Sequence, residues 1–464
     1  MNSQTTHTAD IASQIHPHTN LREFEQQGAM VMTGGQGVWV YDDTGKKYLE
    51  GMSGLWCVSL GYGNQRLIEA ATRQLNQLAY YQNFAHKSTR PAIELSEKLL
   101  RLAPVPMSKV MFQSSGSEAN DTAIKLCWYY WNARGQPQRR KLISRMNAYH
   151  GTGIASASLT GLPHLHKEWN LPLPGFLHTD CPHYYRYGNT GESPEDFATR
   201  CANNLEALIL REGPDTIAAF FAEPIMGTGG LIVPPPTYFE KIQAVLRKYS
   251  ILLVVDEVIT GFGRTGQMWG AQLYDLRPDI ITCAKALSSA YMPIAALLLS
   301  QPIYEAMREQ TDKVGVLGHG YTYGAHPVCA AVALEAVTIY EGESFLQHVR
   351  DVGGYLQRSV RERFSDHPLV GEIRGLGMFC GMEIVADKAS KQSFAAALKV
   401  PARISSVAQG KGLMIRPLMN SVVFAPPLIT ERSHIDFALD VYAAALQETL
   451  EWLRAAGNLQ PGAT

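Results

Sequence analysis

Cysteine is scarce in this sequence and never occurs at a spacing typical of a metal or redox motif. Seven cysteines are scattered through 464 residues, and none forms a C-x-x-C pair. An odd number of dispersed cysteines is typical of free thiols in a reducing compartment. We therefore expect free thiols, no metal site and a cytoplasmic location.

The sequence also lacks an excess of charge of either sign and any long apolar run. The formal net charge is −1, which favours neither nucleic acid nor an anionic membrane as a partner. No run of about eighteen apolar residues occurs, so no membrane span is expected. The opening residues, MNSQTTHTADIASQ, have no basic start followed by an apolar stretch, so no signal peptide is expected.

The composition is that of an ordinary globular protein, with 46% apolar and 18% charged residues. The length suffices for a large core and two lobes. After a helix from about residue 327, alternating runs predict a smaller sheet in the C-terminal lobe. Before it, short apolar runs alternate with helical patterns, which predicts a parallel sheet covered by helices on both faces. These runs are residues 109–113, 141–146, 217–221, 251–255 and 280–283.

The N-terminal segment has three distinct parts. Residues up to about His18 are polar and predict a mobile arm. Residues 37–50 alternate around a D-D-T-G turn, which predicts a hairpin. Residues 53–61 are flanked by glycine, with Trp56 at the centre of the segment. A core position and a pocket-lining position are comparable alternatives for that Trp.

The stretch from residue 251 to residue 289 carries the strongest chemical signal. Its first apolar run ends in Asp256 and Glu257, and its second ends in Ala284-Lys285-Ala286. Open α/β sheets bind ligands at the carboxyl ends of their strands. Pyridoxal phosphate needs this pair of groups, because an acid keeps its ring nitrogen protonated and a lysine holds its aldehyde as a Schiff base. Alone, either residue would usually be a solvated surface charge.

A second feature is Ser114-Ser115-Gly116-Ser117, which follows a predicted strand and precedes a helical pattern. Backbone N–H groups and hydroxyls at a helix N-terminus bind phosphate well. Serine also caps ordinary helices. A phosphate cup and a simple cap are therefore equal alternatives here.

Tyrosine and histidine follow the predicted strand 141–146. Tyr149 is either a ring that stacks on a planar ligand or a buried tyrosine with a satisfied hydroxyl. His150 is more readily a packed histidine beside such a ring than a base. His164 and His166, placed on a predicted strand, could ligate a metal, but no third ligand is suggested and we reject that site.

Arg416 interrupts an apolar strand pattern in Met414-Ile415-Arg416-Pro417. Burying an arginine is costly without an anionic partner. That partner is either a neighbouring acid of the protein or the carboxylate of a substrate, which arginine binds with two parallel hydrogen bonds.

Residues 261–266, G-F-G-R-T-G, match the glycine pattern of dinucleotide-binding proteins. The following residues contain Gly270 and Pro278 and no apolar helical stripe, whereas that pattern must open a helix. Asp256 and Glu257 would also repel phosphates. A nicotinamide-dependent oxidoreductase therefore remains a minor alternative.

Taken together, the motifs resemble the class III, or omega, aminotransferases of the fold-type I pyridoxal phosphate enzymes. The matching motifs are GLWCVSLGYG, SSGSEANDT, AYHG, FFAEPIMGTGG, VVDEVITGFGRTG, CAKALSS and HGYTYGAHP. Within that family the sequence is most similar to the amine:pyruvate aminotransferases. The resemblance implies an α/β protein with a large, mostly parallel sheet domain flanked by helices. It also implies a smaller α+β domain from the N- and C-terminal segments. The expected division is an N-terminal arm and hairpin over 1–60, a pyridoxal phosphate domain over 61–326 and a small domain over 327–464.

The resemblance also implies a role for individual residues. Lys285 and Asp256 would be catalytic, and Thr322 would reach the phosphate of a neighbouring subunit. The residues implied to hold the cofactor are Ser115, Gly116, Ser117, Tyr149, His150, Glu223, Asp256, Val258, Lys285 and Thr322. The residues implied to bind substrate are His18, Trp56, Phe84, Tyr149 and Arg416.

The expected reaction moves an amino group from an amine to pyruvate or another 2-oxo acid by a ping-pong mechanism. The expected assembly is a homodimer, or a tetramer, with active sites shared between subunits. Relatives that act on ornithine, acetylornithine or 4-aminobutyrate carry a glutamate where this sequence has Thr228, which argues against those substrates. His18 and Ala85 replace phenylalanines of the amine:pyruvate enzymes, so a diamine or another polar amine is a candidate donor.

Other functions are open on the same residues. An aminomutase or a decarboxylating aminotransferase would use the same lysine and aspartate. A pyridoxal-binding regulator would need a DNA-binding or partner module, and the sequence shows neither a basic recognition helix nor an appended domain.

Overall fold

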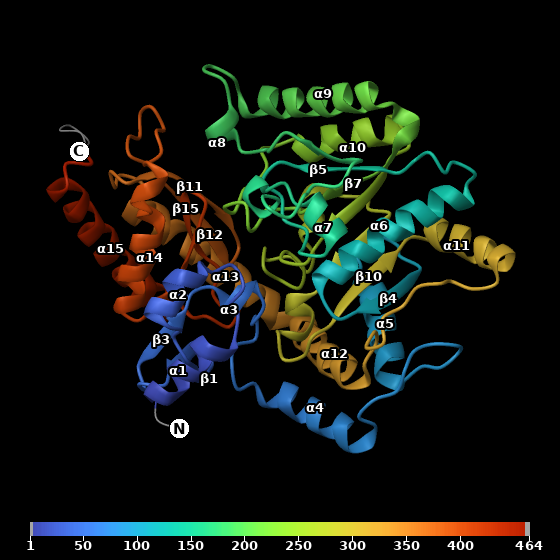
Figure 1. Cartoon of the computed structure of the whole chain (residues 1–464), viewed down its shortest axis with the longest axis horizontal. Coiled ribbons are helices and arrows are strands. Elements are labelled where there is room, and N and C mark those ends of the chain that lie inside the picture. Colours follow the sequence, from blue (N-terminus) through green and yellow to red (C-terminus); the bar gives the residue numbers. More distant parts are fainter. Residues whose placement is uncertain (1–2, 460–464) are drawn as a thin grey trace.

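The structure is a computed structural model that describes residues 3–459. Its larger lobe is built on one seven-stranded sheet (Figure 1). Neighbouring strands β6, β5, β7, β8 and β9 run parallel, whereas β10 is antiparallel to both of its neighbours. The predicted mostly parallel sheet is therefore confirmed. In spatial order the strands are β4 (Lys109–Gln113), β10 (Ala295–Leu299), β9 (Ile280–Cys283), β8 (Leu252–Asp256), β7 (Ile217–Ala222), β5 (Lys141–Arg145) and β6 (Phe176–Thr179).

Helices cover both faces of this sheet, as Figure 1 shows. Every residue of β7, β8, β9 and β10 is buried, which explains their unbroken apolar runs. Along β8, Leu252 and Val254 pack toward α6 (Gly116–Ala133), and Leu253 and Val255 pack toward α9 (Pro194–Glu212) and α10 (Tyr238–Lys248). Side chains alternate along a strand. The same alternation turns Asp256, the last residue of β8, toward α6.

A third group of helices packs beside the antiparallel strands β9 and β10. It consists of α4 (Gln65–Gln77), α5 (Arg90–Leu102) and α12 (Pro327–Glu341), which share one apolar core. Helix α11 (Gln301–Val314) packs against α6 on the other side. The smaller helical elements are α1 (Ser3–Ser13), α2 (Leu21–Gln27), α3 (Ser53–Trp56), α7 (Ile154–Leu159), α8 (Tyr184–Tyr187) and 3-10 turns at Pro163–Leu165, Pro214–Thr216, Gly270–Tyr274, Lys285–Ser288 and Ala396–Leu398. Among the described helices, none has the length and apolar character needed to cross a bilayer.

The smaller lobe joins the two ends of the chain. One sheet has the order β1 (Met32–Gln36), β2 (Trp39–Asp42), β3 (Lys47–Glu50) and β13 (Leu413–Met414), so a C-terminal strand completes the N-terminal hairpin. The second sheet has the order β11 (Val370–Leu376), β12 (Phe379–Ile384), β15 (Ser421–Phe424) and β14 (Arg416–Leu418). The predicted hairpin and smaller sheet are both confirmed.

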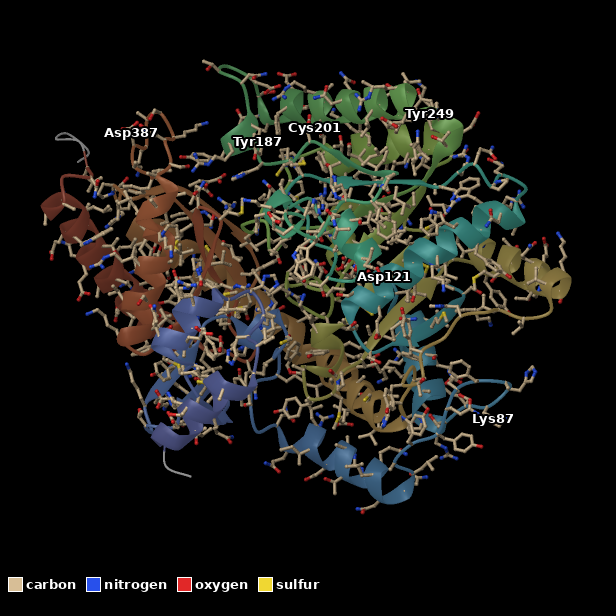
Figure 2. All side chains as sticks on the ribbon, viewed as in Figure 1. Lys87, Asp121, Tyr187, Cys201, Tyr249 and Asp387 are labelled. Carbon is tan, nitrogen blue, oxygen red and sulfur yellow. The ribbon has the colours of Figure 1, made fainter. Side chains whose placement is uncertain are left out.

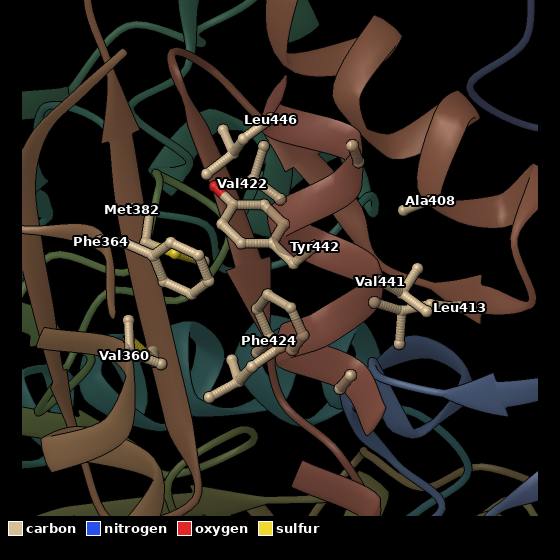
Figure 3. Close-up of a cluster of buried hydrophobic side chains, with 14 of the residues drawn as sticks. Val360, Phe364, Met382, Ala408, Leu413, Val422, Phe424, Val441, Tyr442 and Leu446 are labelled. Carbon is tan, nitrogen blue, oxygen red and sulfur yellow. The ribbon is translucent and has the colours of Figure 1, made fainter. Parts of the chain in front are cut away.

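Three long helices enclose the core of this lobe, namely α13 (Glu343–Phe364), α14 (Val400–Gly410) and α15 (Arg432–Ala455). Figure 3 shows Tyr442 at the centre of the cluster, between Phe364 and Phe424. Its ring meets both rings edge to face, with centroids 5.1 and 5.4 Å apart. Contacts of this kind add to the burial of apolar area.

The prediction of a mobile N-terminal arm is wrong for the described residues. Residues 3–13 form helix α1, and His7 Nε2 lies 3.1 Å from the carboxylate of Asp43 in the hairpin turn. Beyond the helix, the ring of His16 stacks on Phe24, with centroids 4.2 Å apart. Residues 1 and 2 lie outside the described part of the chain.

Two smaller predictions also need correction. His164 and His166 were expected on a strand, but Pro163 opens a 3-10 turn at this point. Proline is common in the first turn of a helix, so the sequence also predicts a helix that starts at the proline triplet 234–236. In the structure this helix, α10, begins later, at Tyr238. In both places proline fixes the backbone in a turn conformation, which apolar periodicity does not report.

The G-F-G-R-T-G segment joins the two lobes. The buried guanidinium of Arg264 donates to the carbonyl oxygens of Met378, at 3.0 Å, and Pro426, at 2.6 Å. It also donates to the hydroxyl of Ser53 at 3.1 Å. The next helical element is only the 3-10 turn Gly270–Tyr274. The dinucleotide interpretation therefore lacks the helix that it requires.

Replacing Arg264 with methionine should lower the free energy of unfolding by about 3 kcal/mol, because two buried carbonyl groups would lose a charged donor. Urea denaturation followed by circular dichroism measures this change. The matched control is Arg277→Met, since Arg277 pairs with Asp275 on the surface and should contribute far less. Equal effects of the two substitutions would contradict the joining role of Arg264.

Candidate active site

A cavity of about 660 Å³ opens at the carboxyl ends of β8 and β9, where the two lobes meet. Its walls come from the N-terminal segment, the large lobe and the β14 region. Most of the residues singled out in the sequence line it together. They are His18, Trp56, Ser115, Gly116, Ser117, Tyr149, His150, Glu223, Asp256, Val258, Lys285 and Arg416.

Asp256 lies at the closed end of this cavity, and three donors fix its carboxylate. Oδ2 accepts from Asn120 Nδ2 at 2.8 Å and lies 2.9 Å from His150 Nδ1, while Oδ1 accepts from the backbone N–H of Val258 at 3.0 Å. Charge-assisted hydrogen bonds of this kind hold a carboxylate firmly in one orientation. The side chain is 4% exposed, so the acid faces the cavity rather than solvent.

Lys285 follows the neighbouring strand β9 and opens a 3-10 turn with a φ of 45°. Burial lowers the pKa of this lysine, and the charge of Asp256 opposes that effect. A lysine must lose its proton to act as a nucleophile or a base. The cavity therefore favours the neutral amine that such chemistry needs.

The N-terminus of α6 forms a second wall of the cavity. Ser115 Oγ accepts from the N–H of Glu118 at 3.2 Å, so this serine does cap the helix. Gly116 packs closely here, because a Cβ would lie 3.1 and 3.2 Å from the two methyl groups of Val258, closer than most Cβ contacts. The first N–H groups of a helix have no partners within the helix and attract anions. The serine segment is thus a cap that faces the same cavity as Lys285.

Glu223 and Tyr149 lie beside the acid. The carboxylate of Glu223 accepts from the N–H groups of Tyr149, at 3.0 Å, and Gly227, at 2.9 Å. Burial raises the pKa of Glu223. Glu223 therefore supports the loop that carries Tyr149, whose own ring lines the cavity.

Trp56 fulfils both alternatives that the sequence left open. It is 2% exposed, and its ring meets Phe379 edge to face with centroids 6.4 Å apart. It also forms part of the cavity wall. The φ of 65° at Trp56 turns the backbone into the left-handed region, which few residues of this size adopt.

Arg416 lies on β14 and forms part of the cavity wall. No described carboxylate forms an ion pair with it, so the alternative of a neighbouring protein acid is wrong. Burial lowers the pKa of its guanidinium, and the charge of Tyr149 acts against this effect. An arginine held in a cavity without an acid is suited to bind an incoming carboxylate.

Phe84 and Thr322 lie outside this cavity and close to each other. Tyr80 OH donates to the backbone oxygen of Thr322 at 2.7 Å, and a Cβ at Gly320 would lie 2.8 Å from the ring of Phe84. Both are exposed, with Phe84 at 44%. The predicted role of Thr322 concerns the phosphate of a neighbouring subunit and stays a prediction. The predicted substrate contact of Phe84 also stays a prediction, since Phe84 does not line this cavity.

The sequence argument missed Asn120 and the cavity position of His164. The amide of Asn120 donates to the backbone oxygen of His150 at 2.7 Å as well as to Asp256, and it accepts from Thr282 Oγ1 at 2.9 Å. It therefore ties α6 to the acid and to β9. The sequence signal that could have identified Asn120 is its position one turn after Gly116, which places it on the same side of the helix.

The donor set of the cavity fits pyridoxal phosphate. A carboxylate suits the protonated ring nitrogen, a lysine with a lowered pKa suits the aldehyde, and the N-terminus of α6 suits the phosphate. Tyr149 and Val258 are the cavity residues predicted to lie on the two faces of the ring. The residue types and their arrangement therefore both agree with what this cofactor requires.

Comparison with known proteins gives consistent similarities. The family model described as "Aminotransferase class-III" matches residues 22–446. Gamma-aminobutyrate transaminase 1, mitochondrial, of Oryza sativa subsp. japonica is 47% identical over 423 residues, which cover 91% of this chain and 82% of that protein.

Solved structures are similar over almost the whole chain. The crystal structure of the omega transaminase from Pseudomonas jessenii in complex with PMP has a TM-score of 0.95 at 52% identity. The match covers 96% of this chain and 98% of that chain. The crystal structure of a thermostable 6-fold mutant of an omega transaminase from Pseudomonas jessenii also has a TM-score of 0.95 at 52% identity, over 96% of this chain and 99% of that chain.

Asp256→Asn should weaken retention of pyridoxal phosphate about 10- to 100-fold, because a charge-assisted hydrogen bond contributes about 1.5–3 kcal/mol. Fluorescence titration of the cofactor-free protein measures the affinity. The neighbouring acid supplies a matched control, since Glu257 is turned away and accepts from Thr260, Gly270 and Ala271. If Glu257→Gln weakened cofactor binding as much as Asp256→Asn, the assigned role of Asp256 would be lost.

Proposed function

This chain belongs to the aminotransferase class-III family, and we propose that it moves the amino group of an amine without an α-carboxylate to pyruvate or another 2-oxo acid. The observation that carries the proposal is Arg416, a cavity arginine for which the described residues provide no acid. Such a group can bind the carboxylate of a 2-oxo acid and leave room for an amine that has none. The similarity to omega transaminases supports this substrate class.

A second candidate donor comes from the relatives named gamma-aminobutyrate transaminases. Their donor is an ω-amino acid, in which a carboxylate stands several carbons away from the amine. Thr228, which lines the cavity, argued against this donor from sequence alone. The identity of 47% to such a relative makes ω-amino acids a class to be tested beside simple amines.

The residues divide the reaction between them. Pyridoxal phosphate, when bound, supplies an electron sink that stabilises negative charge on the carbon of the amine. Lys285, with its lowered pKa, takes the proton from that carbon and returns it at the end of the half-reaction. Asp256 would keep the ring nitrogen of the bound cofactor protonated, and Tyr149 and Val258 would hold its ring. Arg416 orients the 2-oxo acid in the second half-reaction.

We also propose a homodimer with shared active sites. Aromatic side chains gather on the exposed surface around Phe84, namely Tyr80, Tyr81 and Tyr323 with exposures of 37%, 45% and 65%. Figure 2 places Lys87 on a loop that projects from the body of the molecule beside this surface. A surface of this kind is typical of a protein interface, and Thr322 lies within it.

Two other class III reactions use the same lysine and aspartate, namely those of aminomutases and decarboxylating aminotransferases. Product analysis separates them. An aminomutase moves the amino group within one molecule and forms no alanine, and a decarboxylating aminotransferase releases carbon dioxide together with the ketone and alanine. The proposed reaction gives alanine and the aldehyde or ketone without carbon dioxide. An absorbance spectrum of the purified protein distinguishes a bound pyridoxal cofactor from the nicotinamide cofactor of the minor alternative.

Lys285→Ala should abolish the visible absorbance of the covalently held cofactor and reduce turnover at least about 10³-fold, because the base and the covalent link are lost together. The spectrum and the rate of alanine formation measure both effects. Lys313→Ala, at the exposed end of α11, serves as the control lysine. Turnover that survives in Lys285→Ala would overturn the mechanism.

Arg416→Leu should raise KM for pyruvate about 10- to 100-fold while changing the half-reaction with a simple amine much less, because only pyruvate carries a carboxylate. Stopped-flow spectroscopy measures the two half-reactions separately. Equal losses in both half-reactions would refute the role of Arg416 in binding the carboxylate.

A further inference from the structure

Arg374 on β11 lies behind two walls of the active-site cavity, and we propose that it is a positioning residue that holds Thr228 and Arg416 at a fixed separation. Its guanidinium does not line the cavity and instead binds the two segments that carry these residues. The inference rests on the proposed function, and it adds a residue that determines how the carboxylate of the acceptor is oriented.

The first wall is the loop after β7, which carries Thr228 into the cavity. Arg374 Nε donates to the backbone oxygens of Gly230, at 3.1 Å, and Leu231, at 2.9 Å, and Nη2 also donates to the oxygen of Gly230. Gly230 has a φ of 112°, and a Cβ there would lie 3.3 Å from Arg374 Nη2. A side chain at residue 230 would be strained and would crowd the guanidinium. The loop is therefore shaped to receive this arginine.

The second wall is the hairpin of β14 and β15, which carries Arg416. Arg374 Nη2 donates to Ser421 Oγ at 2.6 Å, and Ser421 lies opposite Leu418 in the register of the hairpin. Leu418 lines the cavity two residues after Arg416. Because backbone hydrogen bonds join the two strands, a shift of Ser421 would move Arg416 with it.

Two buried acids fix the guanidinium between these walls. Nη1 lies 2.8 Å from a carboxylate oxygen of Glu372, and Nη2 lies 2.8 Å from a carboxylate oxygen of Glu383. Burial would raise the pKa of Glu383, but the charges of Arg374 and Arg186 lower it to about 2. Glu383 is therefore ionised and compensates the charge of the buried arginine. A planar guanidinium can bind these acids and both walls together, whereas the point charge of a lysine cannot.

The experiment compares pyruvate with acetaldehyde, which has a hydrogen in place of the carboxylate, each with 1-phenylethylamine as donor and each scored by acetophenone formation. In the wild-type protein kcat/KM should favour pyruvate, since only pyruvate can bind Arg416. In Arg374→Met the ratio of the two kcat/KM values should fall about 10-fold, because a displaced Arg416 loses part of a charge-assisted contact. A loss of folded protein lowers both values equally, so a constant ratio would overturn the proposal. No preference for pyruvate in the wild type would refute the role of Arg416 and this inference with it.

Arg186→Met is the matched control. Arg186 binds the same acid, with Nε 2.8 Å from Glu383 Oε1, and its other acceptor is the backbone oxygen of Lys391, outside both walls. This substitution should leave the ratio as in the wild type. An equal fall in Arg186→Met and Arg374→Met would assign the effect to the ion pairs as a group and would refute the role given to Arg374.

Two milder substitutions decide the question if Arg374→Met does not fold. Ser421→Ala removes the contact with the hairpin, and Arg374→Lys keeps a positive charge beside the acids but loses the planar set of donors. Each should lower the ratio about 3-fold while the circular dichroism spectrum stays that of the wild type. A wild-type ratio in both variants would contradict the inference.

A binding measurement keeps this inference separate from the proposed reaction. Propanoate resembles pyruvate but has no ketone, so it can bind without reacting. Calorimetry with the holoenzyme should show that Arg374→Met weakens propanoate binding about 10-fold and that Arg416→Leu abolishes it. Binding that Arg374→Met leaves unchanged would refute the positioning role. A lack of acetophenone with both acceptors would instead refute the transfer reaction.

Discussion

The active site depends on the pairing of two neighbouring parallel strands. Asp256 on β8 lies opposite Thr282 on β9, and Lys285 follows three residues after Thr282, just beyond the end of β9. Because both strands point the same way, their carboxyl ends meet at one edge of the sheet and bring an acid and an amine into one cavity. Asn120 then joins both strands to α6, since it contacts Asp256 and Thr282 together. The start of that helix, where we predict the phosphate site, is thereby placed at a fixed position relative to both groups.

Burial of these ionisable groups would be costly without specific partners. The protein meets that cost differently at each position. Asp256 and Glu223 receive hydrogen bonds from the protein, whereas Lys285 and Arg416 have lowered pKa values and face the cavity. Among the described residues, none forms a hydrogen bond or an ion pair with the side chains of Lys285 and Arg416, which are predicted to bind the cofactor and the substrate. Perturbed ionisable groups of this kind are typical of functional sites.

The periodicity of the sequence predicted the central strands well because they are buried on both faces. The predicted run 280–283 matches β9 to the residue. The periodicity did not predict that β10 runs antiparallel to both β4 and β9, because an apolar run does not indicate the direction of its strand. It also failed at the N-terminal segment, where a polar composition concealed helix α1 and the contacts of His7 and His16 with the body.

By itself, the sequence determined which residues are the candidates for the chemistry: a strand ending in Asp256, another ending near Lys285, a serine-glycine segment before a helix, and Arg416 in an apolar strand. Those are local patterns, and residue types report them directly. Only the tertiary structure decided that Arg416 has no acid among the described residues, that His18 and His164 line the same cavity as Lys285, and that Phe84 and Thr322 lie outside that cavity. These properties depend on contacts between segments far apart in the chain, and such contacts follow from how the lobes pack rather than from any single stretch.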